Sequence, residues 1–175
     1  MAKVLFIIAK KGFRDVEYFI PREILEKAGY TITVASNSKA GETAIGADDG
    51  EVKIDLNYTK AKIDDFDAVI FIGGPGALEN LDNAESYRLI QETVAKDKIL
   101  GAICIAPAIL AKVGVLKNKK ATVWSSTFNK SGIEVLKNNS ADYIGENVVQ
   151  DGKIITANGP LVAKEFGEKL LSVLR

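Results

Sequence analysis

A buried strand leads straight into a helix at residues 99–107, where the sequence is Ile99-Leu100-Gly101-Ala102-Ile103-Cys104-Ile105-Ala106-Pro107. The continuous apolar run 99–103 predicts a strand that is covered on both faces. Pro107 suits the first turn of a helix because its φ is fixed, and the helical pattern continues over 108–113. Cys104 therefore lies in the sharp turn between strand and helix, with an alanine two positions away on either side. This is the layout of a nucleophile elbow, in which small neighbours prevent collisions with adjacent strands.

Working outward in both directions, the same alternation of apolar strands and amphipathic helices recurs along the chain. Further strands are expected at 4–9, 31–35, 68–72 and 121–124, and helices at 15–28, 84–94, 133–137 and 162–174. Residues 51–58 alternate apolar and polar side chains, which is typical of an edge strand. Asp151-Gly152 predicts a tight hairpin between 147–150 and 153–157. The pattern as a whole predicts a single α/β domain over 1–175, with a doubly wound, mainly parallel sheet and helices on both faces.

Composition excludes several classes of function. The 175 residues contain 23 acidic and 23 basic side chains, one cysteine and no histidine. Without histidine, neither a Ser-His-Asp nor a Cys-His arrangement can form within one chain, and a single cysteine allows neither an internal disulfide nor a cysteine-rich zinc site. The balanced charge offers no basic stripe for nucleic acid or for an anionic membrane, so neither is an expected partner.

The lengths of the apolar runs and the single cysteine bear on localisation. The apolar run 4–9 is shorter than the core of a signal peptide, and no run approaches the roughly 18 residues of a membrane-spanning helix. The protein is therefore expected in the cytoplasm, where a lone thiol stays reduced.

Ligands of open parallel sheets bind beyond the carboxyl ends of the strands. Three segments follow such ends, namely 10–17, 73–76 and 103–107. Cys104 is the strongest candidate, because unpaired amides at a helix N-terminus favour a thiolate and are expected to lower the pKa of its thiol. The alternative is an inert core cysteine, since free cysteines are among the most buried residues.

The Gly73-Gly74-Pro75-Gly76 turn has two possible roles. Gly73 and Gly74 could bind substrate together with Ile105, the amides of Gly74 and Ile105 converging on an oxyanion near the sulfur, or the segment could simply be a tight turn into a helix. Its spacing does not match a dinucleotide-binding fingerprint.

Glu17 is the expected acid-base partner of Cys104, because no histidine is available. Apolar neighbours would bury its carboxyl and raise its pKa, so that it could donate a hydrogen bond or carry a proton. The alternative is an ordinary solvated glutamate on a helix surface. Trp124, at the end of a predicted strand, could form a wall of the same pocket or belong to the core.

Four motifs in this order resemble the ThiJ/PfpI superfamily, which includes the Parkinson-linked protein, PfpI-type proteases, and reported glyoxalases and deglycases. They are Phe13-Arg14-Asp15-Val16-Glu17, Ile72-Gly73-Gly74-Pro75-Gly76-Ala77, Ala102-Ile103-Cys104-Ile105-Ala106-Pro107 and Thr156-Ala157-Asn158-Gly159-Pro160. The resemblance implies a flavodoxin-like three-layer sandwich with Cys104 as nucleophile and redox-sensitive thiol, a protonated Glu17 bonded to the sulfur, and a homodimer. It also implies that Asn158, Gly159 and Pro160 lie near the pocket rim.

Two positions depart from the branches of this superfamily. Ile105 stands where the protease-like branch has histidine, which disfavours an intracellular cysteine peptidase. Trp124 stands where the Parkinson-linked branch has a histidine.

The function that this resemblance favours is a cysteine-dependent enzyme for small reactive carbonyls, converting methylglyoxal to lactate without a metal or organic cofactor. The alternative is a non-catalytic redox sensor or stress-response protein, in which an oxidant converts Cys104 to sulfenic or sulfinic acid.

Overall fold

The computed structural model describes residues 2–175. Met1, the first residue of the predicted domain, lies outside them. A seven-stranded sheet in the order β11-β12-β8-β7-β1-β3-β6 forms the centre of the fold. Its strands are β1 (Lys3–Ile8), β3 (Thr31–Ser36), β6 (Leu56–Asn57), β7 (Ala68–Phe71), β8 (Ile99–Ile103), β11 (Val148–Asp151) and β12 (Ile154–Ala157). Within this sheet every neighbouring pair is parallel except β11 and β12, which form the predicted hairpin.

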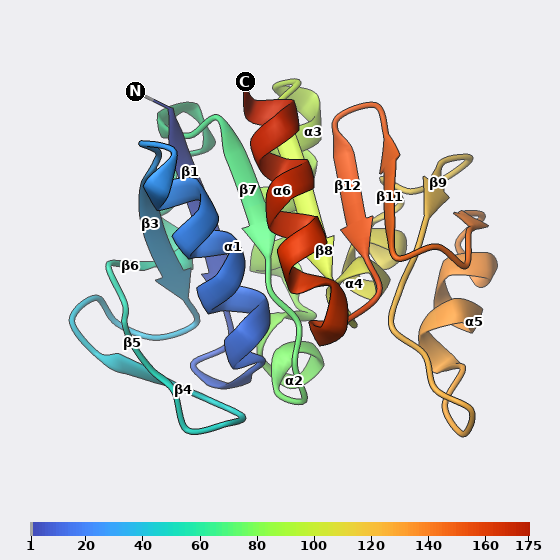
Figure 1. Ribbon diagram of the computed structural model, residues 1–175, viewed down its shortest axis with the longest axis horizontal. Helices are drawn as coiled ribbons and strands as arrows, with labels where there is room; N and C mark the ends of the chain where they lie inside the picture. The colour runs from blue at the N-terminus through green and yellow to red at the C-terminus, as the bar shows by residue number, and fades with distance from the viewer. Residues whose placement is uncertain (1) are drawn as a thin grey trace.

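Helices cover both faces of this sheet (Figure 1). α1 (Asp15–Lys27) and α6 (Ala163–Leu174) lie side by side on one face. α3 (Ala84–Ala95) and α4 (Ala106–Val113) pack on the other. The remaining helical elements are α2 (Ala77–Leu81), α5 (Ser131–Asn138), and the 3₁₀ turns Tyr58–Lys60, Ile63–Asp65 and Pro160–Val162. The three layers confirm the predicted fold class.

The core follows from the apolar runs. Val4 to Ile8 of β1 and all of β7 are completely buried, as expected of strands between two helical layers. α1 and α6 approach closely because Gly167 has no side chain at their crossing, where a Cβ would lie 2.9 Å from the Cα of Pro21. Helix α1 is continuous through Pro21. Among the described residues, no helix has the length and apolar character needed to cross a membrane.

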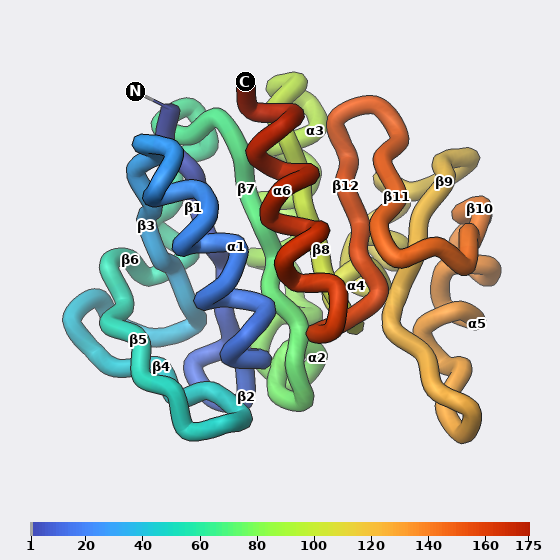
Figure 2. Tube along the Cα trace, in the orientation of Figure 1, coloured from blue at the N-terminus to red at the C-terminus, as the bar shows by residue number. Residues whose placement is uncertain are grey.

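The predicted edge strand over 51–58 is only partly correct. β6 does form one edge of the main sheet, but β5 (Glu51–Lys53) pairs with β4 (Thr43–Gly46) in a separate sheet that also contains β2 (Lys11–Phe13) (Figure 2). The two strands separate at Asp55. Its backbone amide donates to the Val34 carbonyl at 2.9 Å, while its carboxylate accepts from the Val34 amide at 2.8 Å. The Asp55 side chain therefore accepts the hydrogen bond that a strand backbone would otherwise accept from Val34, and the predicted continuous strand ends at this residue.

The strand predicted over 121–124 is also mostly wrong. Only β9 (Lys120–Ala121) forms, and it pairs with β10 (Asp142–Tyr143). Beyond it the backbone amides bind separate partners, that of Thr122 to the Thr156 hydroxyl at 3.0 Å and that of Trp124 to the Cys104 carbonyl at 2.8 Å. Trp124 is therefore held by the elbow itself rather than by a strand.

Two smaller expectations shift in register. The sequence places an apolar stripe of Ala84, Tyr87, Ile90 and Val94 on the helix over 84–94. In α3 this stripe is rotated, since Val94 is exposed and the buried face consists of Ser86, Leu89, Ile90 and Thr93. Thr93 can be buried because its hydroxyl donates to the Leu89 carbonyl at 2.6 Å. The hairpin turn is Gly152-Lys153, one residue later than expected, and Gly152 takes a φ of 59°.

Candidate active site

Cys104 adopts the strained backbone of a nucleophile elbow. Its φ is +64°, a left-handed conformation that costs a non-glycine residue about 1–2 kcal/mol. Backbone hydrogen bonds hold it there, because its amide donates to the Ala157 carbonyl at 2.9 Å and its carbonyl accepts from the Trp124 amide at 2.8 Å. The residue is 8% exposed, and it lines a cavity beyond the end of β8.

Gly73, at the end of the neighbouring strand β7, packs directly against the elbow. Its carbonyl accepts from the Arg14 amide at 2.9 Å, and its own amide donates to Glu17 Oε2 at 3.1 Å. Gly73 was expected among the substrate-binding residues, but its amide is engaged by Glu17 and it does not line the cavity. It therefore positions Glu17 against Cys104.

Glu17 is completely buried on α1, and its carboxyl group lies beside the Cys104 thiol, close enough for each group to shift the pKa of the other. Oε1 has no hydrogen-bond partner among the described residues, so an ionised carboxylate would leave a charged oxygen poorly compensated. Burial raises the pKa of Glu17 to about 7, although the thiol, the Gly73 amide and the Arg14 guanidinium all oppose the increase. At neutral pH a large fraction of this carboxyl is protonated.

The expected lowering of the Cys104 pKa is wrong. Burial raises the pKa of the thiol, and the neighbouring Glu17 carboxyl raises it further. Hydrogen bonds from the amides of Gly74 and Ile105 to the cysteine act in the opposite direction without outweighing these two effects. The position of Cys104 at a helix N-terminus predicts a lowered thiol pKa, but that prediction leaves out the cost of removing a thiolate from water.

Since Glu17 and Cys104 touch, they titrate as a pair. The pair loses its first proton at a pH near the Glu17 pKa of about 7. The Gly74 and Ile105 amides favour the arrangement in which the negative charge is on sulfur and the proton is on Glu17.

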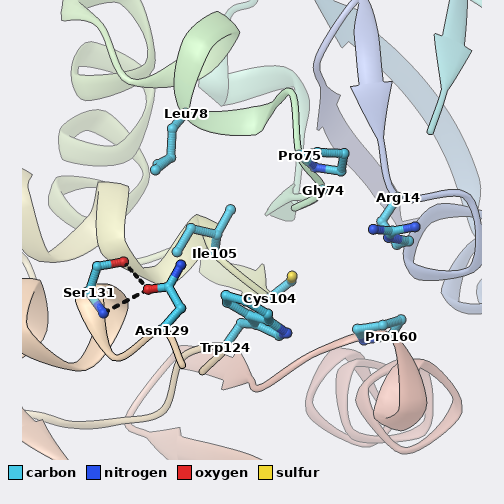
Figure 3. Close-up of a pocket in the computed structure, with 10 residues that line it drawn as sticks. All are labelled: Arg14, Gly74, Pro75, Leu78, Cys104, Ile105, Trp124, Asn129, Ser131 and Pro160. Carbon is cyan, nitrogen blue, oxygen red and sulfur yellow. Dashed lines mark hydrogen bonds between the residues drawn. The ribbon is translucent and has the colours of Figure 1, made fainter. Parts of the chain in front are cut away.

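The cavity in front of the thiol has a volume of about 270 Å³ (Figure 3). Five of the predicted site residues line it: Gly74, Cys104, Ile105, Trp124 and Pro160. Asn158 and Gly159 do not. They line a second cavity of about 250 Å³, which shares only the Trp124 and Pro160 walls with the first.

Five other residues that the sequence did not single out complete the lining: Arg14, Pro75, Leu78, Asn129 and Ser131. Arg14 and Pro75 belong to the motifs 13–17 and 72–77, and their positions beyond strand ends could have indicated that they line the ligand site. Asn129 and Ser131 belong to the loop after Trp124 and the start of α5, and no spacing or composition pattern distinguishes them.

A buried acidic side chain fixes the loop that faces Arg14. Asp15 accepts hydrogen bonds from the backbone amides of Asp48 at 3.1 Å and Gly50 at 2.7 Å. This places the Asp48 carboxylate beside the Arg14 guanidinium, with a closest separation of 3.3 Å.

A comparison with known protein families decides the family. The sequence profile described as the DJ-1/PfpI family matches residues 2–173. The chain belongs to the DJ-1/PfpI family.

Three relatives within this DJ-1/PfpI group illustrate the similarity. An uncharacterized protein of Methanocaldococcus jannaschii is 38% identical over 99% of this chain and 82% of its own length. The structure of a ThiJ/PfpI domain protein from Brachyspira murdochii has a TM-score of 0.91 and 31% identity, covering 98% of this chain and 95% of that one. Drosophila melanogaster DJ-1beta has a TM-score of 0.87 and 31% identity, covering 99% and 90%.

Proposed function

We propose that this DJ-1/PfpI chain is a cysteine-dependent enzyme that converts small 2-oxoaldehydes such as methylglyoxal into 2-hydroxy acids. The observation that carries the proposal is the contact between the buried Glu17 carboxyl and the Cys104 thiol beside a cavity of about 270 Å³. This volume suits a molecule of a few heavy atoms. Each chemical step can be assigned to groups of this chain, with no added metal or organic cofactor.

In the first step the Cys104 sulfur attacks the aldehyde carbon. An S–C bond forms, the π bond of the carbonyl breaks, and the thiol proton passes through Glu17 to the new oxygen, giving a thiohemiacetal. The amides of Gly74 and Ile105, which already bond to the cysteine, stabilise the negative charge as it develops on that oxygen.

In the second step Glu17 removes the proton from the former aldehyde carbon and returns it to the adjacent carbon. In the intermediate enediolate the hydroxyl proton of the former aldehyde carbon moves to the former ketone oxygen, and protonation of the adjacent carbon by Glu17 gives a 2-hydroxy thioester. The electrons are thus redistributed within the substrate, and no external oxidant takes part. Water then breaks the S–C bond, which releases the hydroxy acid and restores the thiol. A carboxyl group with a pKa of about 7 is well matched to both proton transfers near neutral pH.

The test is lactate formation from methylglyoxal by the purified protein in the presence of a chelator. Cys104→Ser should abolish turnover, and Glu17→Gln should lower kcat by about 100-fold or more because it removes the proton carrier. Glu23→Gln is a matched control on the same helix, since Glu23 is exposed and forms its ion pair with Lys27 of that helix. Activity retained in Cys104→Ser would refute the mechanism, and an unchanged rate in Glu17→Gln would remove Glu17 from it.

The alternative function is a redox sensor, and the observation in its favour is that the only cysteine of the chain lines an open cavity. Intact mass after mild peroxide treatment distinguishes the two. Absence of turnover together with the gain of one or two oxygens confined to Cys104 would favour the sensor. A peptidase is not proposed, because the sequence contains no histidine. For either function we propose a reducing compartment, the cytoplasm, as the place where Cys104 acts.

A further inference from the structure

Arg14 is the only charged side chain among the ten residues that line the Cys104 cavity, and none of the ten is acidic. Its guanidinium is also close enough to lower the pKa of Glu17. The side chain comes from the start of α1, so its position is tied to the same helix that carries Glu17. A positive charge on the wall of a small cavity favours an anionic ligand.

The guanidinium has a free edge for such a ligand. Both of its hydrogen bonds to Asp48 come from Nη1, at 3.3 and 3.4 Å, while Nε and Nη2 have no partner among the described residues. These two groups form the side-on edge that binds a carboxylate through two parallel hydrogen bonds. The Asp48 contact is long for a charge-assisted bond, and both side chains are partly exposed, so this pair holds Arg14 only weakly.

A second hydrogen-bond donor is fixed on the cavity wall. Asn129 Oδ1 accepts from the Ser131 amide at 3.0 Å and from the Ser131 hydroxyl at 2.6 Å. These bonds orient the amide group and leave Nδ2 without a partner among residues 2–175. Figure 3 shows Arg14 and Asn129 on opposite sides of Cys104, with the Asn129 nitrogen directed toward Ile105. A ligand that extends from the sulfur therefore meets donors on either side.

We propose that this site selects small carbonyl compounds that carry a carboxylate, with Arg14 binding the carboxylate through Nε and Nη2 and Asn129 donating to a ligand oxygen. The inference rests on the proposed function, because it names the substrate class of the same site. Among 2-oxoaldehydes, the preferred substrates are those with a carboxylate on a later carbon. The uncharged methylglyoxal lacks the group that Arg14 recognises.

Two alkylating reagents test this recognition without requiring turnover. Iodoacetate and iodoacetamide have nearly the same size, and each forms an S–C bond with loss of iodide, but only iodoacetate carries a carboxylate. Cys104 is the only cysteine, so the intact mass reports its modification alone. The ratio of the two rates cancels the fraction of thiolate, because the same thiolate attacks both reagents.

In Arg14→Gln we expect this iodoacetate-to-iodoacetamide ratio to fall about tenfold, the usual effect of losing a hydrogen bond to a charged group. Asp48→Asn should raise the ratio, since it removes the carboxylate that pairs with the guanidinium. Arg14→Lys should give an intermediate value because it keeps the charge but not the side-on edge. Lys130→Gln removes the same charge from a nearby residue that does not line the cavity, and should leave the ratio unchanged. Circular dichroism verifies that each variant is folded.

Two results would overturn the inference. One is an unchanged ratio in Arg14→Gln. The other is an equal slowing of both reagents, which would mean that Arg14 acts on the thiol through Glu17 and does not recognise the ligand. Comparison of methylglyoxal with a carboxylate-bearing 2-oxoaldehyde completes the test, since Arg14→Gln should raise KM for the charged compound only. If neither compound is turned over, the proposed function fails, whereas the alkylation ratio still decides the role of Arg14.

Discussion

Gly73 lies so close to Cys104 that a Cβ added to the glycine would be 2.6 Å from the Cβ of the cysteine. The same added atom would lie 2.6 Å from the Ile103 carbonyl oxygen and 2.9 Å from Glu17 Oε2. Three parts of the site therefore meet at one glycine: the elbow after β8, the end of β7 and the acidic side chain of α1. The absence of a single side chain allows Glu17 to reach the thiol.

Gly73→Ala should destabilise the protein by about 3 kcal/mol, as expected when an atom is forced into a packed interior. Two of the three nearest atoms belong to the backbone or a Cβ and cannot move aside freely. Chemical denaturation measures the change. Gly145→Ala is the control, since the nearest atom to its added Cβ would be the Tyr143 hydroxyl oxygen at 3.7 Å. Its stability should stay within about 0.5 kcal/mol of the wild type, as is usual for surface substitutions. Equal stabilities of the two variants would contradict the packing described here.

Glu17→Gln should change how stability depends on pH. The folded-state pKa of Glu17 is about 7, above its ordinary value of 4.5, so the folded protein retains a proton that the unfolded chain releases between these values. The corresponding stabilisation is fully present below about pH 4.5 and is lost as the pH rises through about 7. Relative to the wild type, Glu17→Gln should therefore gain about 2.5 kcal/mol between pH 5 and pH 8. Urea unfolding at these two pH values measures the difference, and a gap that does not vary with pH would show that Glu17 is ionised throughout.

Cys104→Gly should be more stable than Cys104→Ala by about 1 kcal/mol, because only glycine adopts positive φ without strain. Both variants lose the thiol, so the comparison isolates the backbone at φ +64°. At Ala106, within α4, the same exchange of alanine for glycine should be destabilising, since glycine is unfavourable inside a helix. Thermal unfolding of the variants is sufficient, and a more stable Cys104→Ala would mean that the elbow is not strained.

Asp15→Ala should loosen the loop that carries Asp48. The carboxylate of Asp15 is almost completely buried and accepts from two backbone amides, so its removal should cost about 2 kcal/mol. Hydrogen exchange should accelerate at the amides of Asp48 and Gly50, while those of β8 stay protected. Asp49→Asn is the control, because Asp49 is exposed and asparagine tolerates its φ of 66°. Unchanged exchange at the two amides would remove Asp15 from this role.

The central sheet could be predicted well from the sequence because its strands are buried on both faces and therefore consist of continuous apolar runs. Residues 68–71 and 99–103 are buried in a sheet with a helical layer on each face, and continuous apolar runs suit such positions. The short peripheral strands were missed or misplaced because single side chains determine them. Asp55 ends a strand through its own hydrogen bond to Val34, and no periodicity in the sequence reports that bond.

The same distinction applies to the site. Cys104 and Glu17 could be predicted from their places beyond strand ends, and the contact between them is present. The sign of the Cys104 pKa change could not be predicted, because it depends on the balance between desolvation and the amide dipoles in three dimensions. Asn158 and Gly159 follow the right strand but belong to the second cavity, since Trp124 separates them from the thiol.

That separation gives this chain a simple route to new specificity. Two chambers of about 270 and 250 Å³ meet at Trp124 and Pro160, so the usable space is limited by side chains and not by the course of the backbone. Replacing the indole by a small side chain would open one chamber into the other without moving any strand of the main sheet. Substitutions at position 124 could therefore change which molecules the protein binds in the course of evolution. The strained backbone at Cys104 would stay the same.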